Sequence, residues 1–284
     1  MATSTLDHIV HLTPPGTVHE TSEQWRRLGF NVIDGGVHTG GLTANSLVII
    51  EDHTYLELIA FTQPPEAYPP GSPSRRAREA HKWAKRAPGW IDYACLGNGA
   101  VEGSRRISDI INARWNGTAP LYHKEVSGGR TRADGVVLEW VISAPEREDG
   151  VLPFFCGDVT DRRLRVPTQQ ASNTRHPCGA RGVAHIRIIA SEADFALACD
   201  ELSAALGALP FERATGKAQW HLSTLNGLRS PTLVLATPRP ADQDEVQFVA
   251  GNLGPGIYEV GFWVGEGGEE GSVMSPFGKI VWVK

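Results

Sequence analysis

Three polar side chains could act together in chemistry if the fold brings them into one place: His8, Glu57 and Glu139. Both glutamates lie between apolar neighbours in runs that look like strands. A carboxylate in such a place is costly unless it is paired or bound to a metal. Two carboxylates that meet repel each other unless a cation or a proton lies between them. These residues therefore predict one shared polar site.

The first interpretation of this site is a divalent metal bound by His8, Glu57 and Glu139. One imidazole and two carboxylates suit Mn, Mg, Zn or Fe. The metal could bind adjacent oxygens of a substrate and stabilise an enolate or alkoxide. A second interpretation is a metal-free acid–base site. The simplest alternative is that each glutamate bonds to a nearby Arg or Tyr, while His8 is a core histidine.

The same order of elements, a strand, a helix and three strands, recurs along the chain. The copies span about residues 6–61, 90–143 and 182–236. Repeats of this length predict a fold of duplicated units. Tyr93 and His185 fall where the first copy has His8, whereas Val234 falls where it has Glu57. The third copy is therefore expected to be a structural addition or a wall of the cavity.

Strand alternation predicts which side chains face the cavity. In the first copy, Tyr55, Glu57 and Ile59 share one face, and the leucines between them suit packing against the helix. By the same argument Glu139 faces the cavity in the second copy, and Trp140 faces the helix. This assignment makes Glu57 and Glu139 candidate catalytic residues.

A glycine-flanked segment adds two further candidates, His38 and Asn45. Glycine pairs precede and follow His38, and Asn45 opens the next strand. His38 is predicted to be a general acid or base on a mobile lid, and Asn45 a hydrogen-bonding partner of the substrate. The alternative is a tight bend capped by its own polar side chains.

Three more residues are predicted to contact the substrate: Tyr93, His185 and Trp220. His185 could line the cavity if the third copy covers its opening. Trp220 could form part of an apolar wall. Ordinary packing is the alternative for each strand histidine and for the tryptophan.

The first two copies resemble the glyoxalase-like domain proteins of the vicinal oxygen chelate superfamily. The resemblance depends on four segments of the first copy and three of the second: residues 6–10, 35–38, 41–45, 55–59, 130–135, 138–145 and 152–155. It implies an α+β fold in which βαβββ modules pair and curved mixed sheets enclose a cavity. It also implies that metal ligands, where present, come from the first and last strands of each module. The matching positions are His8, Glu57, Tyr93 and Glu139.

The chain is expected to divide into paired modules over residues 1–160, with a connector helix within 62–89. A linker at 161–181 and a third module with extra C-terminal strands at 182–284 follow. A homodimer is one arrangement that the sequence leaves open, because an unpaired third module can need a partner surface.

Composition limits the partners. The net charge of −5 gives no reason to expect nucleic acid or an anionic membrane. No segment has the ~20 apolar residues of a membrane span, and residues 1–7 show no secretory signal. The four cysteines form no CxxC pair. We therefore expect a cytoplasmic protein with a small-molecule substrate.

Together these features predict a lyase or isomerase that acts on a small oxygenated or carbonyl-bearing molecule, in detoxification or secondary metabolism. The alternative is a non-catalytic protein that binds a small molecule in the same cavity, as resistance proteins of this superfamily do. A ring-cleaving dioxygenase is less expected, because the two-histidine, one-carboxylate set of iron oxygenases is incomplete.

Overall fold

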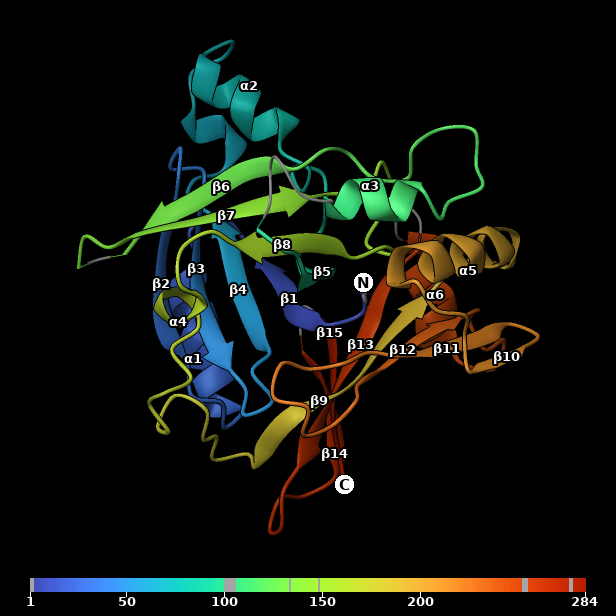
Figure 1. Ribbon diagram of the computed structural model, residues 1–284. Coiled ribbons are helices and arrows are strands. Elements are labelled where there is room, and N and C mark those ends of the chain that lie inside the picture. The colour runs from blue at the N-terminus through green and yellow to red at the C-terminus, as the bar shows by residue number, and fades with distance from the viewer. Residues whose placement is uncertain (1–2, 100–105, 133, 148, 252–254, 276–277) are drawn as a thin grey trace.

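The computed structural model describes residues 3–99, 106–132, 134–147, 149–251, 255–275 and 278–284. A barrel is formed by eight strands: β1 (Leu6–Thr13), β2 (Ile33–His38), β3 (Thr43–Ile49), β4 (Tyr55–Phe61), β5 (Gly89–Leu96), β6 (Val126–Thr131), β7 (Val137–Ser143) and β8 (Phe154–Asp158). The barrel closes in the order β1-β4-β3-β2-β6-β7-β8-β5 (Figure 1). Alternate side chains of every strand therefore point into one enclosed space.

Two βαβββ modules make up the barrel, as predicted. The first contains helix α1 (Val18–Arg27) and the second helix α3 (Ile107–Asn112). In each module the first strand pairs in parallel with the last, β1 with β4 and β5 with β8. The modules join where β1 runs antiparallel to β5 and where β2 meets β6.

The last strand of the second module is β8, and the prediction that Glu139 lies on the last strand is wrong. The apolar run before β6 contributes only an isolated bridge between Tyr122 and Pro145. Glu139 therefore lies on β7, the third strand of its module. Short apolar runs do not reveal which of them will join a ladder, because pairing depends on distant partners.

A second sheet holds the rest of the chain in the order β10-β11-β12-β9-β13-β15-β14. Its strands are β9 (Ala180–Ile189), β10 (Glu212–Ala214), β11 (Lys217–His221), β12 (Thr232–Ala236), β13 (Gly256–Val264), β14 (Gly271–Ser275) and β15 (Gly278–Val283). β9 pairs in parallel with β12, as in a module, and β13 runs antiparallel to β9 and parallel to β15. The third module thus forms a separate sheet beside the barrel, and none of its described residues lines the barrel cavity.

Helix α5 (Glu192–Leu206) follows β9 in the chain, and helix α6 (Gln243–Gly251) precedes β13. The Ser191 side chain caps the start of α5 by accepting from the Asp194 amide. The helix ends at Gly207, whose φ of 71° suits glycine. Helices α5 and α3 lie side by side where the barrel meets the second sheet (Figure 1).

Apolar side chains form two main cores. One fills the space between the outside of the barrel and the second sheet, and it includes Trp25, Tyr93, Ile186 and Phe262. The other lies inside the barrel and includes Val10, Ile59, Leu138, Trp140 and Phe154. The outer core fixes the barrel wall, and the inner core shapes the cavity described below.

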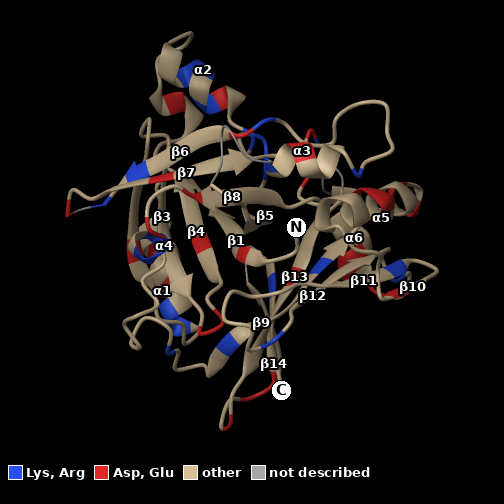
Figure 2. Ribbon diagram, viewed as in Figure 1, with Lys and Arg blue, Asp and Glu red and all other residues tan. Residues whose placement is uncertain are grey.

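Two connecting segments complete the architecture. The connector carries a short 3-10 helix η1 (Pro65–Ala67) and helix α2 (Pro73–Ala80), and it projects from one end of the barrel (Figure 1). The linker to the second sheet carries α4 (Arg162–Arg165). Acidic and basic residues are spread over both sheets and are not gathered on one of them (Figure 2). No helix in the described ranges has the length and apolarity that crossing a membrane requires.

Candidate functional site

A cavity of about 550 Å³ opens inside the barrel. Aromatic and aliphatic side chains from both modules and from the connector form most of its wall: Leu42, Leu47, Tyr55, Ile59, Trp83, Leu138, Trp140, Ile142 and Phe154. A small polar group projects into this apolar space, and its members are His8, His38, Asn45 and Glu57. An apolar pocket with a few convergent polar groups is typical of a small-molecule site.

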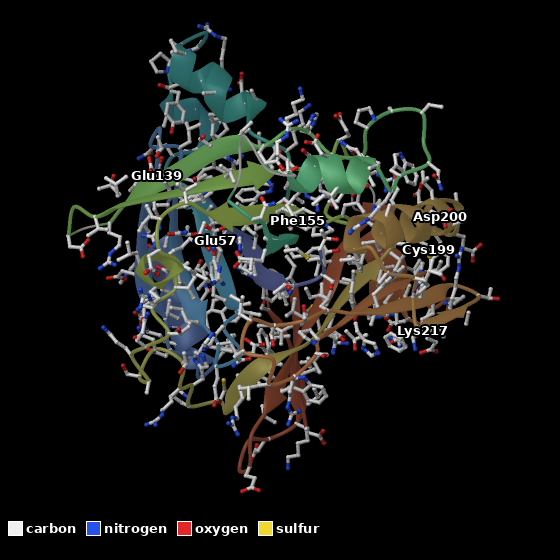
Figure 3. The ribbon with its side chains drawn as sticks, in the orientation of Figure 1. Glu57, Glu139, Phe155, Cys199, Asp200 and Lys217 are labelled. Carbon is white, nitrogen blue, oxygen red and sulfur yellow. The ribbon has the colours of Figure 1, made fainter. Side chains whose placement is uncertain are left out.

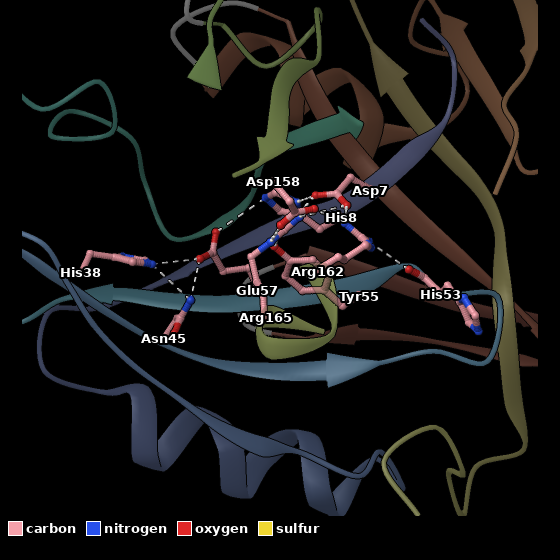
Figure 4. A network of polar contacts seen from close by, with 10 residues as sticks. All are labelled: Asp7, His8, His38, Asn45, His53, Tyr55, Glu57, Asp158, Arg162 and Arg165. Carbon is pink, nitrogen blue, oxygen red and sulfur yellow. Dashed lines mark hydrogen bonds and ion pairs between the residues drawn. The ribbon is translucent and has the colours of Figure 1, made fainter. Parts of the chain in front are cut away.

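Glu57 lies at the centre of the polar group (Figure 4). Its Oε1 accepts a hydrogen bond of 2.6 Å from the Asn45 side chain and lies 3.5 Å from His38 Nε2. Its Oε2 lies 3.9 Å from His8 Nε2. The structure therefore brings together His8, His38, Asn45 and Glu57, and the predicted inward direction of Glu57 is confirmed.

His38 is held as a neutral imidazole. Burial is the largest effect and lowers its pKa, although the nearby Glu57 charge opposes the shift. Nδ1 lies 2.8 Å from the Thr43 hydroxyl, and Nε2 lies 3.3 Å from the Asn45 amide nitrogen. Because the amide of Asn45 has two hydrogens, it can donate to both the carboxylate and the ring. Asn45 thus separates two acceptors that would otherwise meet directly.

His8 is oriented by a buried carboxylate on its other side. Its Nδ1 lies 2.7 Å from Asp7 Oδ2, and its ring stacks on Tyr55 at 4.6 Å between centroids. A carboxylate can only accept hydrogen bonds, so Nδ1 carries the hydrogen that points to Asp7. This arrangement turns His8 Nε2 toward Glu57.

Asp7 is kept ionised by two arginines of the linker (Figure 4). Burial is the largest effect and would raise its pKa, but the charges of Arg165 and Arg162 outweigh it and hold the pKa well below the usual value. Arg165 Nη1 lies 3.1 Å from Asp7, and its other nitrogens bind Asp158 at 2.6 and 2.8 Å. The linker therefore stabilises the orientation of His8 through Asp7.

A glycine in β2 lets Asn45 reach Glu57. A Cβ on Gly35 would lie 1.9 Å from Asn45 Oδ1, which no side chain can tolerate. The same oxygen accepts a hydrogen bond of 3.1 Å from the Gly36 amide. The glycine pair identified in the sequence thus has a definite structural role: it makes room for Asn45 and fixes its orientation.

Glu139 borders the cavity but does not join the polar group around Glu57, and the predicted directions of the two faces of its strand are reversed. Leu138 and Trp140 are buried in the barrel interior, whereas Glu139 is exposed and its register partner is Gly129 (Figure 3). Trp140 faces the cavity, where it lies edge-on to His38 at 6.0 Å. A glutamate can occupy an apolar strand at low cost when its side of the strand meets solvent, and this is the case here.

The predicted substrate contacts of Tyr93, His185 and Trp220 are also misplaced. Tyr93 points to the outer core and donates its hydroxyl to the Val151 carbonyl. His185 lies on the second sheet, 2.7 Å from Glu259, and Trp220 is buried in the core beside that sheet. The Tyr93 side chain faces outward from β5, and His185 and Trp220 belong to the other sheet. None of the three therefore lines the barrel cavity.

Comparison with known proteins identifies the family. The family model of the glyoxalase-like domain matches residues 6–203, which is most of the chain. The protein belongs to the glyoxalase-like domain family. The predicted resemblance to glyoxalase-like domain proteins is thereby confirmed. Among curated proteins, none matches this chain.

Solved structures show that the fold is shared widely. A hypothetical protein from Staphylococcus aureus superposes with a TM-score of 0.68 at 9% identity, over 98% of each chain. A mutant of 4-hydroxymandelate synthase from Streptomyces coelicolor gives 0.51 at 15% identity, over 93% of this chain and 72% of that one. BphC, a halotolerant catechol dioxygenase, gives 0.50 at 12% identity, over 99% and 86%. At these identities the likeness establishes the fold alone.

The barrel of this glyoxalase-like protein corrects which residues are equivalent in its two modules. The β1–β5 ladder pairs Ile9 with Tyr93 and Val10 with Asp92. A twofold axis through the Ile9–Tyr93 pair matches His8 with Asp92, and not with Tyr93. The same relation places Phe154 where the first module has Glu57, because Ala94 pairs with Phe154 as Val10 pairs with Glu57.

These positions do not fit the predicted metal centre. Asp92 is already paired with Lys82 at 2.8 Å and accepts from the Trp83 ring nitrogen at 3.1 Å. Phe154 supplies no ligand atom, and the Lys82 ammonium lies 4.1 Å above its ring. Within the described residues, no three His, Cys, Asp or Glu side chains are grouped so that they could hold a metal ion. The cation at this end of the cavity is a lysine of the connector.

The sequence patterns did not identify the site residues that lie in the connector and the linker. Lys82 and Trp83 come from the connector, and Arg165 comes from the linker. The residue types of Lys82 and Arg165 did not indicate a place in the cavity, because lysine and arginine in polar segments are usually solvated. Arg130 lies within a segment that carries the family resemblance, but only the barrel shows that it points inward.

Proposed function

We propose that this glyoxalase-like protein is an enzyme that removes a proton from a small oxygenated molecule in the barrel cavity, with Glu57 as the general base. The observation that carries the proposal is the setting of Glu57, a carboxylate in an apolar cavity with a histidine nitrogen beside each oxygen. Such a setting suits proton transfer, because the carboxylate faces the space that a substrate would occupy and a histidine nitrogen lies near each of its oxygens.

The two oxygens of Glu57 have different roles in this proposal. Oε1 is held by the Asn45 amide at 2.6 Å, which fixes the carboxylate plane. Among the residues that the structure describes, Oε2 has no such donor, and in this proposal it takes the proton of the substrate. His8 Nε2, 3.9 Å away, then accepts that proton or returns it to another atom. Return to a different carbon gives an isomerase, and loss of a leaving group gives a lyase.

The test is proton exchange followed by NMR in D₂O, with a panel of aryl ketones and 2-oxo acids as probes. At least one probe should lose its α-proton signal in the presence of the protein. Glu57→Gln is expected to slow this exchange by about 10²-fold or more, because the amide cannot accept the proton. Binding of the same probe should remain, since the substitution keeps the size of the side chain.

Glu79→Gln is the matched control, because Glu79 lies on the connector helix and pairs with Arg75 at the surface. Exchange that survives Glu57→Gln would contradict the proposal. Probes that bind without any exchange would favour the alternative of a non-catalytic binding protein. Metal analysis of the purified protein supplies a third outcome, because stoichiometric metal that is lost in Glu57→Ala would restore the metal hypothesis.

A further inference from the structure

Three cationic side chains line the cavity, and two of them already have carboxylate partners. Lys82 pairs with Asp92, and Arg165 pairs with Asp7 and Asp158. Arg130 is the exception in the part of the chain that the structure describes. Its hydrogen bond there goes from Nη1 to the Gly35 carbonyl at 2.6 Å, and no carboxylate lies within ion-pair distance.

The position of Arg130 on the barrel places this residue beside His38. Arg130 on β6 is the register partner of His38 on β2 and of Leu138 on β7. Register partners point to the same side of a sheet, so Arg130 enters the cavity beside His38. A Cβ on Gly36 would lie 3.2 Å from Nη1, so the glycine leaves the space that this side chain uses.

Arg130 is placed at an energetic cost. Only 4% of the residue is exposed. Burial lowers its pKa, and the more distant groups Tyr55 and Glu57 oppose that shift only in part. A buried cation without a carboxylate partner destabilises a protein, and an arginine fork is well matched to a carboxylate that arrives with a ligand.

We propose that Arg130 binds a carboxylate of the substrate, so that the substrate class is a small organic monocarboxylate with an apolar body. The inference rests on the proposed function, because it names the substrate class of the same cavity. The apolar body would lie against Trp140, Leu138 and Phe154.

Charge and shape favour a carboxylate over a phosphate. One unpaired guanidinium balances one negative charge, and the Glu57 carboxylate in the same cavity opposes a second. The planar fork of arginine forms two parallel hydrogen bonds with a planar carboxylate. Binding the carboxylate at Arg130 would also fix the position of the neighbouring carbon relative to Glu57.

Calorimetric binding of two isosteric probes, phenylacetate and phenylacetamide, tests the inference. The acid is expected to bind the wild-type protein about 10- to 100-fold more tightly than the amide. Arg130→Gln should remove this preference, and Arg130→Lys should reduce it, because lysine keeps the charge but loses the fork. Arg132→Gln is the matched control, since Arg132 is half-buried on the same hairpin and pairs with Asp134.

Equal affinity for acid and amide, a preference that survives Arg130→Gln, or no binding of either probe would overturn the inference. Stronger binding of inorganic phosphate than of phenylacetate would overturn it as well. If Arg130→Gln does not fold, Arg130→Lys decides, and an unchanged preference in it counts against the inference. Glu57→Gln separates the two proposals, because it should abolish proton exchange and leave the preference for the acid intact.

Discussion

Asp7→Asn is expected to lower the free energy of unfolding by about 3–5 kcal/mol, because it removes one partner of a buried ion network. Asp7 is fully buried and bridges Arg165, Arg162 and His8. Arg165 would keep Asp158, but its nitrogen toward Asp7 would face a neutral amide in the protein interior. Denaturant unfolding monitored by tryptophan fluorescence measures the change.

The matched control for Asp7→Asn is Asp161→Asn in the same linker. Asp161 pairs with Arg163 at the surface, and such exposed pairs contribute about 0–1 kcal/mol. Equal losses in the two variants would show that the buried network does not stabilise the fold. The substitution also changes the setting of His8. An amide at position 7 can donate to Nδ1, and this permits the other tautomer of the ring.

The core of the candidate site could be predicted because it depends on local pattern. Glu57 faces the cavity by strand alternation, and the glycine pair beside His38 marks the place where Asn45 approaches the backbone. His8 lies on the strand that pairs in parallel with that of Glu57. All these relations lie within a single module of about fifty residues, so the local sequence pattern predicts them.

The second half of the site could not be predicted in the same way. The position of Glu139 depended on counting strands in a segment where one apolar run forms no ladder. The matching of His8 to Tyr93 was wrong by one residue, and a shift of one residue reverses the direction of every side chain in a strand. Asp92 is the true counterpart, and its partner Lys82 comes from a connector that no repeat describes.

Residues that support the site from a distance gave no pattern to recognise. Arg165 and Asp158 follow the barrel strands in sequence but meet Asp7 at the start of the first strand. Such contacts are set by tertiary packing and not by periodicity. The separate second sheet is a further example, because the third copy obeys the same local pairing rule as the modules and yet lies outside the barrel.

Acid is expected to destabilise the protein through His11, which is buried between Trp25 and Trp90. Burial lowers the pKa of His11 from 6.5 to about 3. Between these two pH values the unfolded chain binds a proton that the folded chain does not, so the free energy of unfolding falls as the pH decreases through this range. By pH 4 the loss from this histidine amounts to about 3 kcal/mol.

Chemical denaturation at several pH values, with the wild type and His11→Gln, checks this expectation. The glutamine variant has no titrating ring, so its stability should fall less between pH 6.5 and pH 4, whatever its stability at neutral pH. The pKa values of His38, His81 and His176 are also lowered by burial, so a shallower slope is expected to remain. His19→Gln, at an exposed position on α1, should keep the wild-type slope. Equal slopes in the wild type and His11→Gln would mean that the ring between the two tryptophans accepts a proton without cost, and that the outer core is more hydrated than its packing indicates.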